Sequence, residues 1–190
     1  MRQVAIAFTT TGNDPKKGHC FREMVAVEQL EDGTCSRVVQ LSFKTPDDPE
    51  RKPFAEQFPE LDALIGDATI VVHNAGIWKK FLRPELATVK DRKARRLLTQ
   101  VFDVNAWAQR SFPKQRRSLE IIARKTNIKI EGQQSGLRLN AERLRLIAAV
   151  AMKQRTEPSI PSDHGVRPDT PVRRLARRLR FCWLGLRGRA

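Results

Sequence analysis

Positive charge is the most prominent chemical feature of this 190-residue sequence. It contains 36 Lys and Arg against 21 Asp and Glu, a formal net charge of +15. Lysine and arginine contact phosphates whatever the base sequence, so this excess predicts attraction to polyanions, nucleic acid first and anionic membranes second. General solubility is the alternative explanation. Nine basic and three acidic residues lie between Arg155 and Ala190, so this segment carries +6 of the total.

Thiol chemistry and zinc binding are not predicted. Cys20, Cys35 and Cys182 are odd in number and far apart, which fits neither a disulfide framework nor a C-x-x-C zinc knuckle. No apolar run approaches the roughly 20 residues of a membrane span, and the first residues lack a signal-peptide cleavage site. We therefore expect a cytoplasmic protein.

The elements that would position functional residues follow from hydrophobic patterning. Short apolar or alternating runs predict strands at 3–8, 21–28, 37–43 and 68–73, and Asp32-Gly33 predicts a hairpin turn. Helical patterns cover 54–65, 75–84, 89–100, 104–111, 117–126 and 136–152. This order predicts an α/β fold with a mixed central sheet flanked by helices.

The carboxyl-terminal part has a different composition. Residues 154–171 contain four prolines and few apolar side chains, which predicts a flexible Pro-rich linker after a domain at 1–153. Residues 172–190 have the pattern of a basic amphipathic helix, with Val172, Leu175, Leu179 and Trp183 in one stripe. Arginines occupy the opposite side. This tail could dock on its own domain, a partner protein, nucleic acid or an anionic membrane, the last being the least favoured. The residues proposed for partner binding are Arg173, Arg174, Leu175, Arg177, Arg178, Leu179 and Trp183.

Five segments between residues 2 and 153 resemble one family, in the right order and spacing. These segments are 5–12, 71–78, 101–103, 111–120 and 136–142, of which 71–78 reads Val-Val-His-Asn-Ala-Gly-Ile-Trp. They resemble the motifs of the DnaQ-like 3′→5′ exonucleases, the family of the DNA polymerase III epsilon subunit. The resemblance implies a ribonuclease-H-like fold.

The same resemblance implies an altered catalytic centre. In this family four carboxylates hold two divalent cations and a histidine activates water, as in other two-metal sites. The corresponding positions here are Ala7, Thr9, Trp78, Ser135 and Asn140, none of them a carboxylate. From this we expect no catalytic residues, no metal and no cofactor, and a pseudoenzyme that is not an enzyme.

Other acidic residues near these motifs offer a further alternative. Asp14, Glu23, Asp103 and Glu142 could in principle rebuild a metal site and restore exonuclease activity, the least favoured hypothesis. Asp103, at a strand end, is better explained as a helix cap, and Glu142 is expected to point away on its helix.

The function expected from the resemblance is binding of single-stranded nucleic acid, as an accessory factor in DNA replication, repair or plasmid or phage maintenance. Trp78 and Phe8 could stack on bases, although Trp78 is better explained as filling the former metal pocket. The alternative is a subunit that docks on a polymerase through 172–190, as the epsilon subunit uses its own tail. The side chains proposed for phosphate contacts are Lys79, Lys80, Lys114, Arg116, Arg117 and Arg138.

Overall fold

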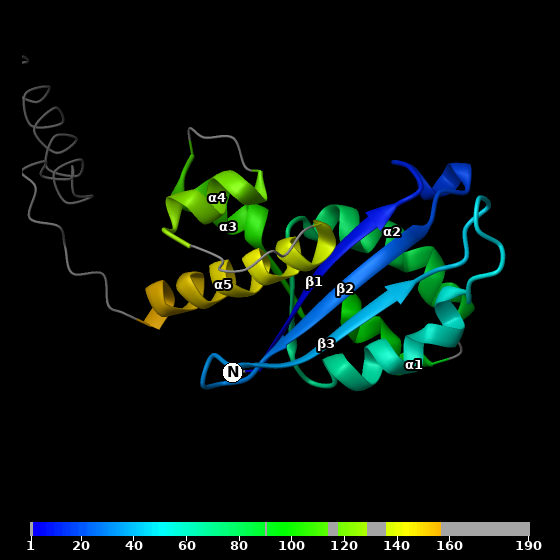
Figure 1. Cartoon of the computed structure of the whole chain (residues 1–190), viewed down its shortest axis with the longest axis horizontal. Coiled ribbons are helices and arrows are strands. Elements are labelled where there is room, and N and C mark those ends of the chain that lie inside the picture. Colours follow the sequence, from blue (N-terminus) through cyan, green and yellow to red (C-terminus); the bar gives the residue numbers. More distant parts are fainter. Residues whose placement is uncertain (1, 90, 114–117, 129–135, 157–190) are drawn as a thin grey trace, which may run out of the picture. The chain divides into compact units, whose positions relative to one another are not determined.

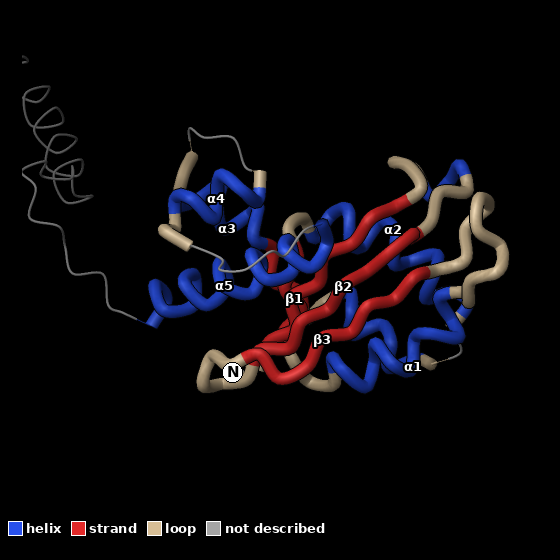
Figure 2. The backbone as a smooth tube through the Cα atoms, viewed as in Figure 1, coloured by secondary structure: helices blue, strands red, loops and turns tan. Residues whose placement is uncertain are grey.

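Five strands form a mixed sheet in the order β3-β2-β1-β4-β5 (Figures 1 and 2). The computed structural model describes residues 2–89, 91–113, 118–128 and 136–156. β1 pairs antiparallel with β2 and parallel with β4, β2 pairs antiparallel with β3, and β4 pairs parallel with β5. The expected α/β fold with a mixed sheet is confirmed. The strands are β1 (Gln3–Thr10), β2 (Phe21–Gln29), β3 (Cys35–Ser42), β4 (Thr69–Val72) and β5 (Val101–Asp103).

Helices cover both faces of this sheet. One face packs on α1 (Phe54–Ile65), α2 (Ala75–Thr88) and the 3₁₀ helix η2 (Arg92–Leu98). The other packs on α3 (Val104–Ser111), α4 (Leu119–Lys125) and α5 (Gly136–Thr156). A short 3₁₀ helix, η1 (Pro15–Lys17), lies between β1 and β2.

The strand sequences explain this sandwich. Successive strand residues point to opposite faces, so Ile6 of β1 faces α1 and α2 while Ala5 and Ala7 face α5. In β4, Ile70 contributes to one core and Val71 to the other. The apolar run at 68–73 is thus a strand covered on both sides, as its composition predicted.

The predicted hairpin turn at Asp32-Gly33 is confirmed. Gly33 has φ 89°, in the left-handed region that glycine tolerates, and its N–H donates to the Leu30 carbonyl at 3.0 Å. The Asp32 carboxylate accepts from the Thr34 amide at 2.9 Å. These contacts set the β2–β3 register in which Val27 opposes Val38.

Several predicted boundaries were wrong. The segment predicted as a helix at 89–100 forms only η2, whose buried Ala94 and Leu97 follow the three-residue period of a 3₁₀ helix. α2 continues past the predicted end at Pro84 to Thr88, because burial of its apolar face offsets the hydrogen bond that proline removes. α5 extends to Thr156, so the first residues of the predicted linker are helical. The rest of the linker, from 157, and the tail at 172–190 lie outside the described residues.

Candidate nucleic-acid interface

The carboxyl end of β1 carries Ala7 and Thr9, two of the positions that correspond to metal-binding carboxylates in the resembled family. Ala7 is buried in the core beneath α5, whereas Thr9, two residues on and on the same side of the strand, is exposed. A methyl group and a neutral hydroxyl therefore occupy positions where the resembled family has carboxylates.

The loop after β1 is held by hydrogen bonds along its length. The Thr11 amide donates to the Cys20 carbonyl at 3.0 Å, and the Asp14 amide donates to His19 Nδ1 at 3.0 Å. The His19 ring covers Gly12 so closely that a Cβ added there would lie 2.5 Å from its Cε1. This packing shows why the Thr-Thr-Thr-Gly sequence needs glycine at its end.

Lys80 joins this loop to α2. Its ammonium donates to the Asn13 carbonyl at 2.8 Å and lies 3.4 Å from an Asp14 carboxylate oxygen. Partial desolvation raises the pKa of Asp14, but the Lys16 amide and Lys80 favour the ionised form more strongly, so the pKa lies below its ordinary value. The Lys80 ammonium is therefore already paired with Asp14, which reduces the positive charge that it can offer to a phosphate.

Asp103 fixes the start of two helices at once. One carboxylate oxygen accepts from the Ala106 amide of α3 at 3.0 Å, and the other accepts from the Ala75 amide of α2 at 3.0 Å. The expectation that Asp103 is a cap is confirmed. Its second bond could not be read from the sequence, because it requires the parallel pairing of β4 with β5.

Trp78 is a core residue. Its side chain is fully buried, its indole Nε1 donates to the Leu97 carbonyl at 3.1 Å, and its ring lies 5.6 Å from Phe8 and 5.7 Å from Phe21. The idea that Trp78 stacks on bases is therefore wrong. Trp78 belongs to the core on the α1–α2 face of the sheet, whereas Ala7 belongs to the core on the α5 face. The Trp78 ring therefore does not fill the space beside Ala7, where it was expected to replace the metal ions.

The first turns of α5 carry Asn140, the last of these motif positions that lies within the described residues. Asn140 is half-buried, and Arg138 is exposed. Glu142 is buried and forms an ion pair with Arg145 at 2.8 Å, so it points elsewhere, as expected. Ser135 lies outside the described residues.

The proposed phosphate-binding cations are brought together only in part. Lys79 and Lys80 lie on α2, and Lys80 reaches the loop after β1. Arg138 lies on α5, in the helix layer on the other face of the sheet. Lys114, Arg116 and Arg117 lie outside the described residues. The described cations thus flank the sheet from two layers.

The side chains at these positions do not fit a pair of divalent cations. Ala7 and Trp78 offer no ligand atom, and Thr9 and Asn140 offer only neutral oxygens. Asp103 is engaged as a cap, Glu142 pairs with Arg145, and Glu23 lies near Arg51 at 3.9 Å. Among the described residues there is no group of three or more His, Cys, Asp or Glu suited to a metal ion. No catalytic step through bound cations follows from this donor set.

The fold has clear neighbours among solved structures. A 3′-exonuclease that recognises the 3′ end of a histone mRNA stem-loop superposes with a TM-score of 0.59 at 14% identity, covering 80% of this chain and 82% of that one. Exonuclease X in complex with 5′-overhanging duplex DNA superposes with a TM-score of 0.55 at 12% identity, covering 83% and 95%. The fold is therefore that of the ribonuclease-H-like exonucleases.

Sequence relatives narrow this class. No family model matches the chain. The DNA polymerase III epsilon subunit of Rickettsia prowazekii is 26% identical over an alignment of 154 residues, and the match covers 70% of this chain and 66% of the relative. Weak sequence similarity and the shared fold together support the resemblance to the DnaQ-like exonuclease family that the motifs indicated. The chain spans 66% of the length of this relative.

The expectation that the chain is not an enzyme is contradicted by these comparisons. Its relatives are polymerase epsilon subunits and its structural neighbours are exonucleases, so the class they indicate is exonuclease. The expectation rested on five replaced motif positions alone, whereas the sequence similarity covers 70% of the chain.

Localisation was predicted from the absence of targeting and membrane signals. No helix within the described residues has the length and apolar character of a membrane span.

Proposed function

We propose that this DnaQ-like protein binds single-stranded nucleic acid across the carboxyl end of β1, in DNA replication or repair. The observation that carries the proposal is the exposed Thr9 at the end of the central strand, between helices that bear Lys79 on one side of the sheet and Arg138 on the other. Cations placed in this way attract phosphates independently of base sequence.

The neutral side chains of β1 support the same proposal. A cluster of carboxylates repels a phosphate backbone unless metal ions cancel its charge. Ala7 and Thr9 carry no charge, so a strand can approach the end of β1 without bound cations. Two neighbours with this fold are described in contact with nucleic acid, a histone mRNA stem-loop in one case and duplex DNA in the other.

Fluorescence polarisation with a short labelled oligothymidylate tests this function. The titration is run in EDTA, which prevents any metal-dependent cleavage from consuming the probe. Each phosphate contact should contribute about −0.7 to the slope of log K against log salt. Lys79→Ala and Arg138→Ala should each weaken binding and reduce the slope by about that amount.

Lys125→Ala is the matched control, because Lys125 is an exposed lysine on α4, away from β1. It should leave affinity and slope unchanged. Lys80 is avoided as a test residue, since its loss would also release the loop after β1. Affinity that is insensitive to salt, or equal in all three variants, would contradict the proposal.

Association with a polymerase is a second candidate, because the relatives are named as subunits of DNA polymerase III. The residues expected to mediate it, at 172–190, lie outside the described part of the chain, so it stays a prediction. Co-purification of the full chain with a polymerase catalytic subunit is the measurement that checks it.

A further inference from the structure

A hollow of about 510 Å³ lies between α2 and η2, on the α1–α2 face of the sheet. Arg83 of α2 and Arg95 of η2 line it from the two helices. Its volume lies within the range of sites that hold small ligands or parts of larger ones. The apolar side chains that line it pack on the core of this face and are Leu86, Val89, Ala94 and Leu98.

The charge of this region is strongly positive. Residues 75–98 contain eight Lys and Arg, and their acidic residues are Glu85 and Asp91. Arg83 and Arg95 are exposed, and within the described part of the chain neither guanidinium has an ion pair or a hydrogen bond. Asp91 also lines the hollow, so its described lining carries two positive charges and one negative charge. The two arginines can therefore accept an anion without breaking an internal contact.

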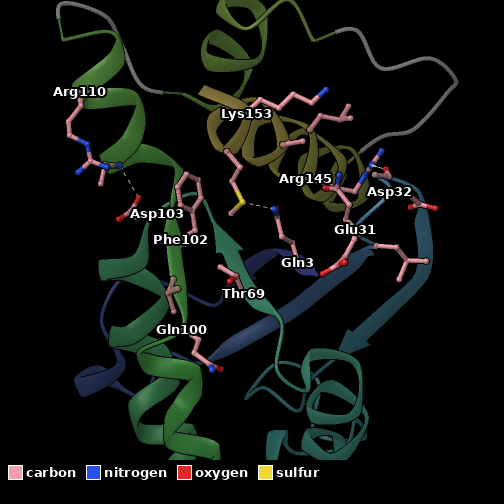
Figure 3. Close-up of a pocket in the computed structure, with 18 residues that line it drawn as sticks. Gln3, Glu31, Asp32, Thr69, Gln100, Phe102, Asp103, Arg110, Arg145 and Lys153 are labelled. Atoms are coloured by element: carbon pink, nitrogen blue, oxygen red, sulfur yellow. Dashed lines mark hydrogen bonds between the residues drawn. The ribbon is translucent and has the colours of Figure 1, made fainter. Parts of the chain in front are cut away.

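The larger hollow on the α5 face, of about 1040 Å³, lacks this preference (Figure 3). Its described lining has three acidic and three basic side chains, so the charges balance. These are Glu31, Asp32, Asp103, Arg110, Arg145 and Lys153. A polyanion is thus favoured at the α2–η2 hollow and not at the larger one.

The α2–η2 hollow continues the proposed nucleic-acid interface along α2. Lys79, the α2 cation of that interface, and Arg83 are four positions apart, so they lie on one side of the helix about 6 Å apart along its axis. Arg83 then borders the hollow that Arg95 closes from η2. A phosphate backbone that passes Lys79 therefore meets Arg83 next and Arg95 after it.

We propose that the α2–η2 hollow holds an unpaired base of a strand that is bound at the end of β1, with Arg83 and Arg95 on the neighbouring phosphates. This inference rests on the proposed function and extends its interface. Guanidinium groups contact phosphates in a bidentate manner and also stack on bases. The flat face of a base covers the apolar floor, whereas an acidic peptide would satisfy the arginines and leave that floor exposed.

Fluorescence polarisation of the full chain with two labelled oligothymidylates tests the proposal. The strands have about 4 and about 12 nucleotides, lengths typical of single-strand sites. In EDTA, the longer strand should give a slope of log K against log salt that is steeper by about 1.4, because two phosphate contacts of about 0.7 each are added. Arg83→Ala and Arg95→Ala should each remove about 0.7 from the slope of the longer strand and leave the shorter strand unchanged. Arg37→Ala, at an exposed position of β3 on the opposite edge of the sheet from β5, is the matched control and should change neither.

Ala87→Glu tests the hollow itself. Ala87 is exposed on α2 and lines the hollow, and glutamate is a good helix former, so the variant should fold while placing a carboxylate where the base would lie. It should remove the additional affinity and slope of the longer strand. Gln40→Glu, on an exposed position of β3, makes a similar change in net charge and should retain both.

The same titrations separate this inference from the interface at β1. Equal slopes for the two strands, or a longer strand that is insensitive to both arginine variants, would overturn the inference even if Lys79→Ala and Arg138→Ala weaken the shorter strand. Loss of the effect of those two variants on the shorter strand would instead contradict the interface at β1. Displacement of the longer strand by polyglutamate as readily as by unlabelled oligothymidylate would overturn the assignment of the hollow to nucleic acid.

Discussion

The helix starts that follow β4 and β5 differ sharply from the buried pair Gln3 and Gln29, which lie opposite each other on β1 and β2. At the helix starts, both carboxylate oxygens of Asp103 accept backbone amides, and the Asn74 side chain accepts from the Ile77 amide at 3.1 Å. In the glutamine pair, both side-chain oxygens are buried without a hydrogen-bond partner. The first region contains family motifs and the second contains none. The comparison shows that these motif residues hold the domain together through satisfied hydrogen bonds, while the unpaired buried groups lie where no motif marks them.

The largest effect expected at the motif region comes from Trp78. Trp78→Ala should reduce the free energy of unfolding by about 3–5 kcal/mol, because it empties a buried aromatic site and removes the bond to Leu97. Denaturant unfolding followed by circular dichroism measures the change. Ile77→Ala, at the preceding position, is the control: its side chain is 47% exposed, so the loss should stay within about 0.5 kcal/mol. Equal losses would place Trp78 at the surface and return it to the candidates for base stacking.

Asp103 tests whether the capped region depends on one carboxylate. Asp103→Ala should cost about 2 kcal/mol, since each lost cap contributes about 1 kcal/mol. Asp103→Asn keeps one acceptor oxygen and replaces the other with a donor, so it should recover about half of that loss. The same unfolding experiment checks both variants. If the two variants are equally unstable, the carboxylate does not serve both helices.

Much of this fold could be predicted, because its strands and helices carry clear periodicity. The alternation in β3 and the apolar run of β4 located those strands, and the helical patterns placed the starts of α1, α2, α3 and α5. The 3₁₀ geometry of η2 was missed because its spacing of buried residues, Ala94 and Leu97, also occurs in α-helices. The burial of Trp78 on the face opposite Ala7 depends on how α2 packs on the sheet, which no motif states.

The buried pair Gln3 and Gln29 could not be found from the sequence for a different reason. Gln3 and Gln29 lie at opposite ends of two strands and read there as ordinary polar residues. Only the antiparallel register places them side by side, and only the packing of α5 buries them. Their missing hydrogen-bond partners are a property of the three-dimensional arrangement.

A satisfied polar network lies on the other face of the same strands and contrasts with the two glutamines. Glu28, one residue before Gln29, accepts hydrogen bonds from the Ser36 hydroxyl and the Arg2 guanidinium. Arg2 also donates to the Leu64 carbonyl at 2.6 Å and to Asp67 at 3.1 Å. The hydrogen bond from Ser36 lowers the pKa of Glu28 below its ordinary value of 4.5; burial opposes this, and the bond and charge of Arg2 add to the lowering.

The pH dependence of stability tests this network and gives the smallest of the three effects. A carboxyl group with a lower pKa in the folded state stabilises fully above its unfolded pKa and loses that stabilisation as pH falls through the folded value. At neutral pH, Glu28→Gln should therefore cost about 1 kcal/mol, the scale of a typical hydrogen bond. The difference from the unsubstituted protein should shrink as the pH is lowered below 4.5. Glu23→Gln, a more exposed carboxylate on β2, controls for the change in net charge. Denaturant unfolding at a series of pH values measures both, and a difference for Glu28→Gln that stays constant into acid would show that ionised Glu28 does not stabilise this face.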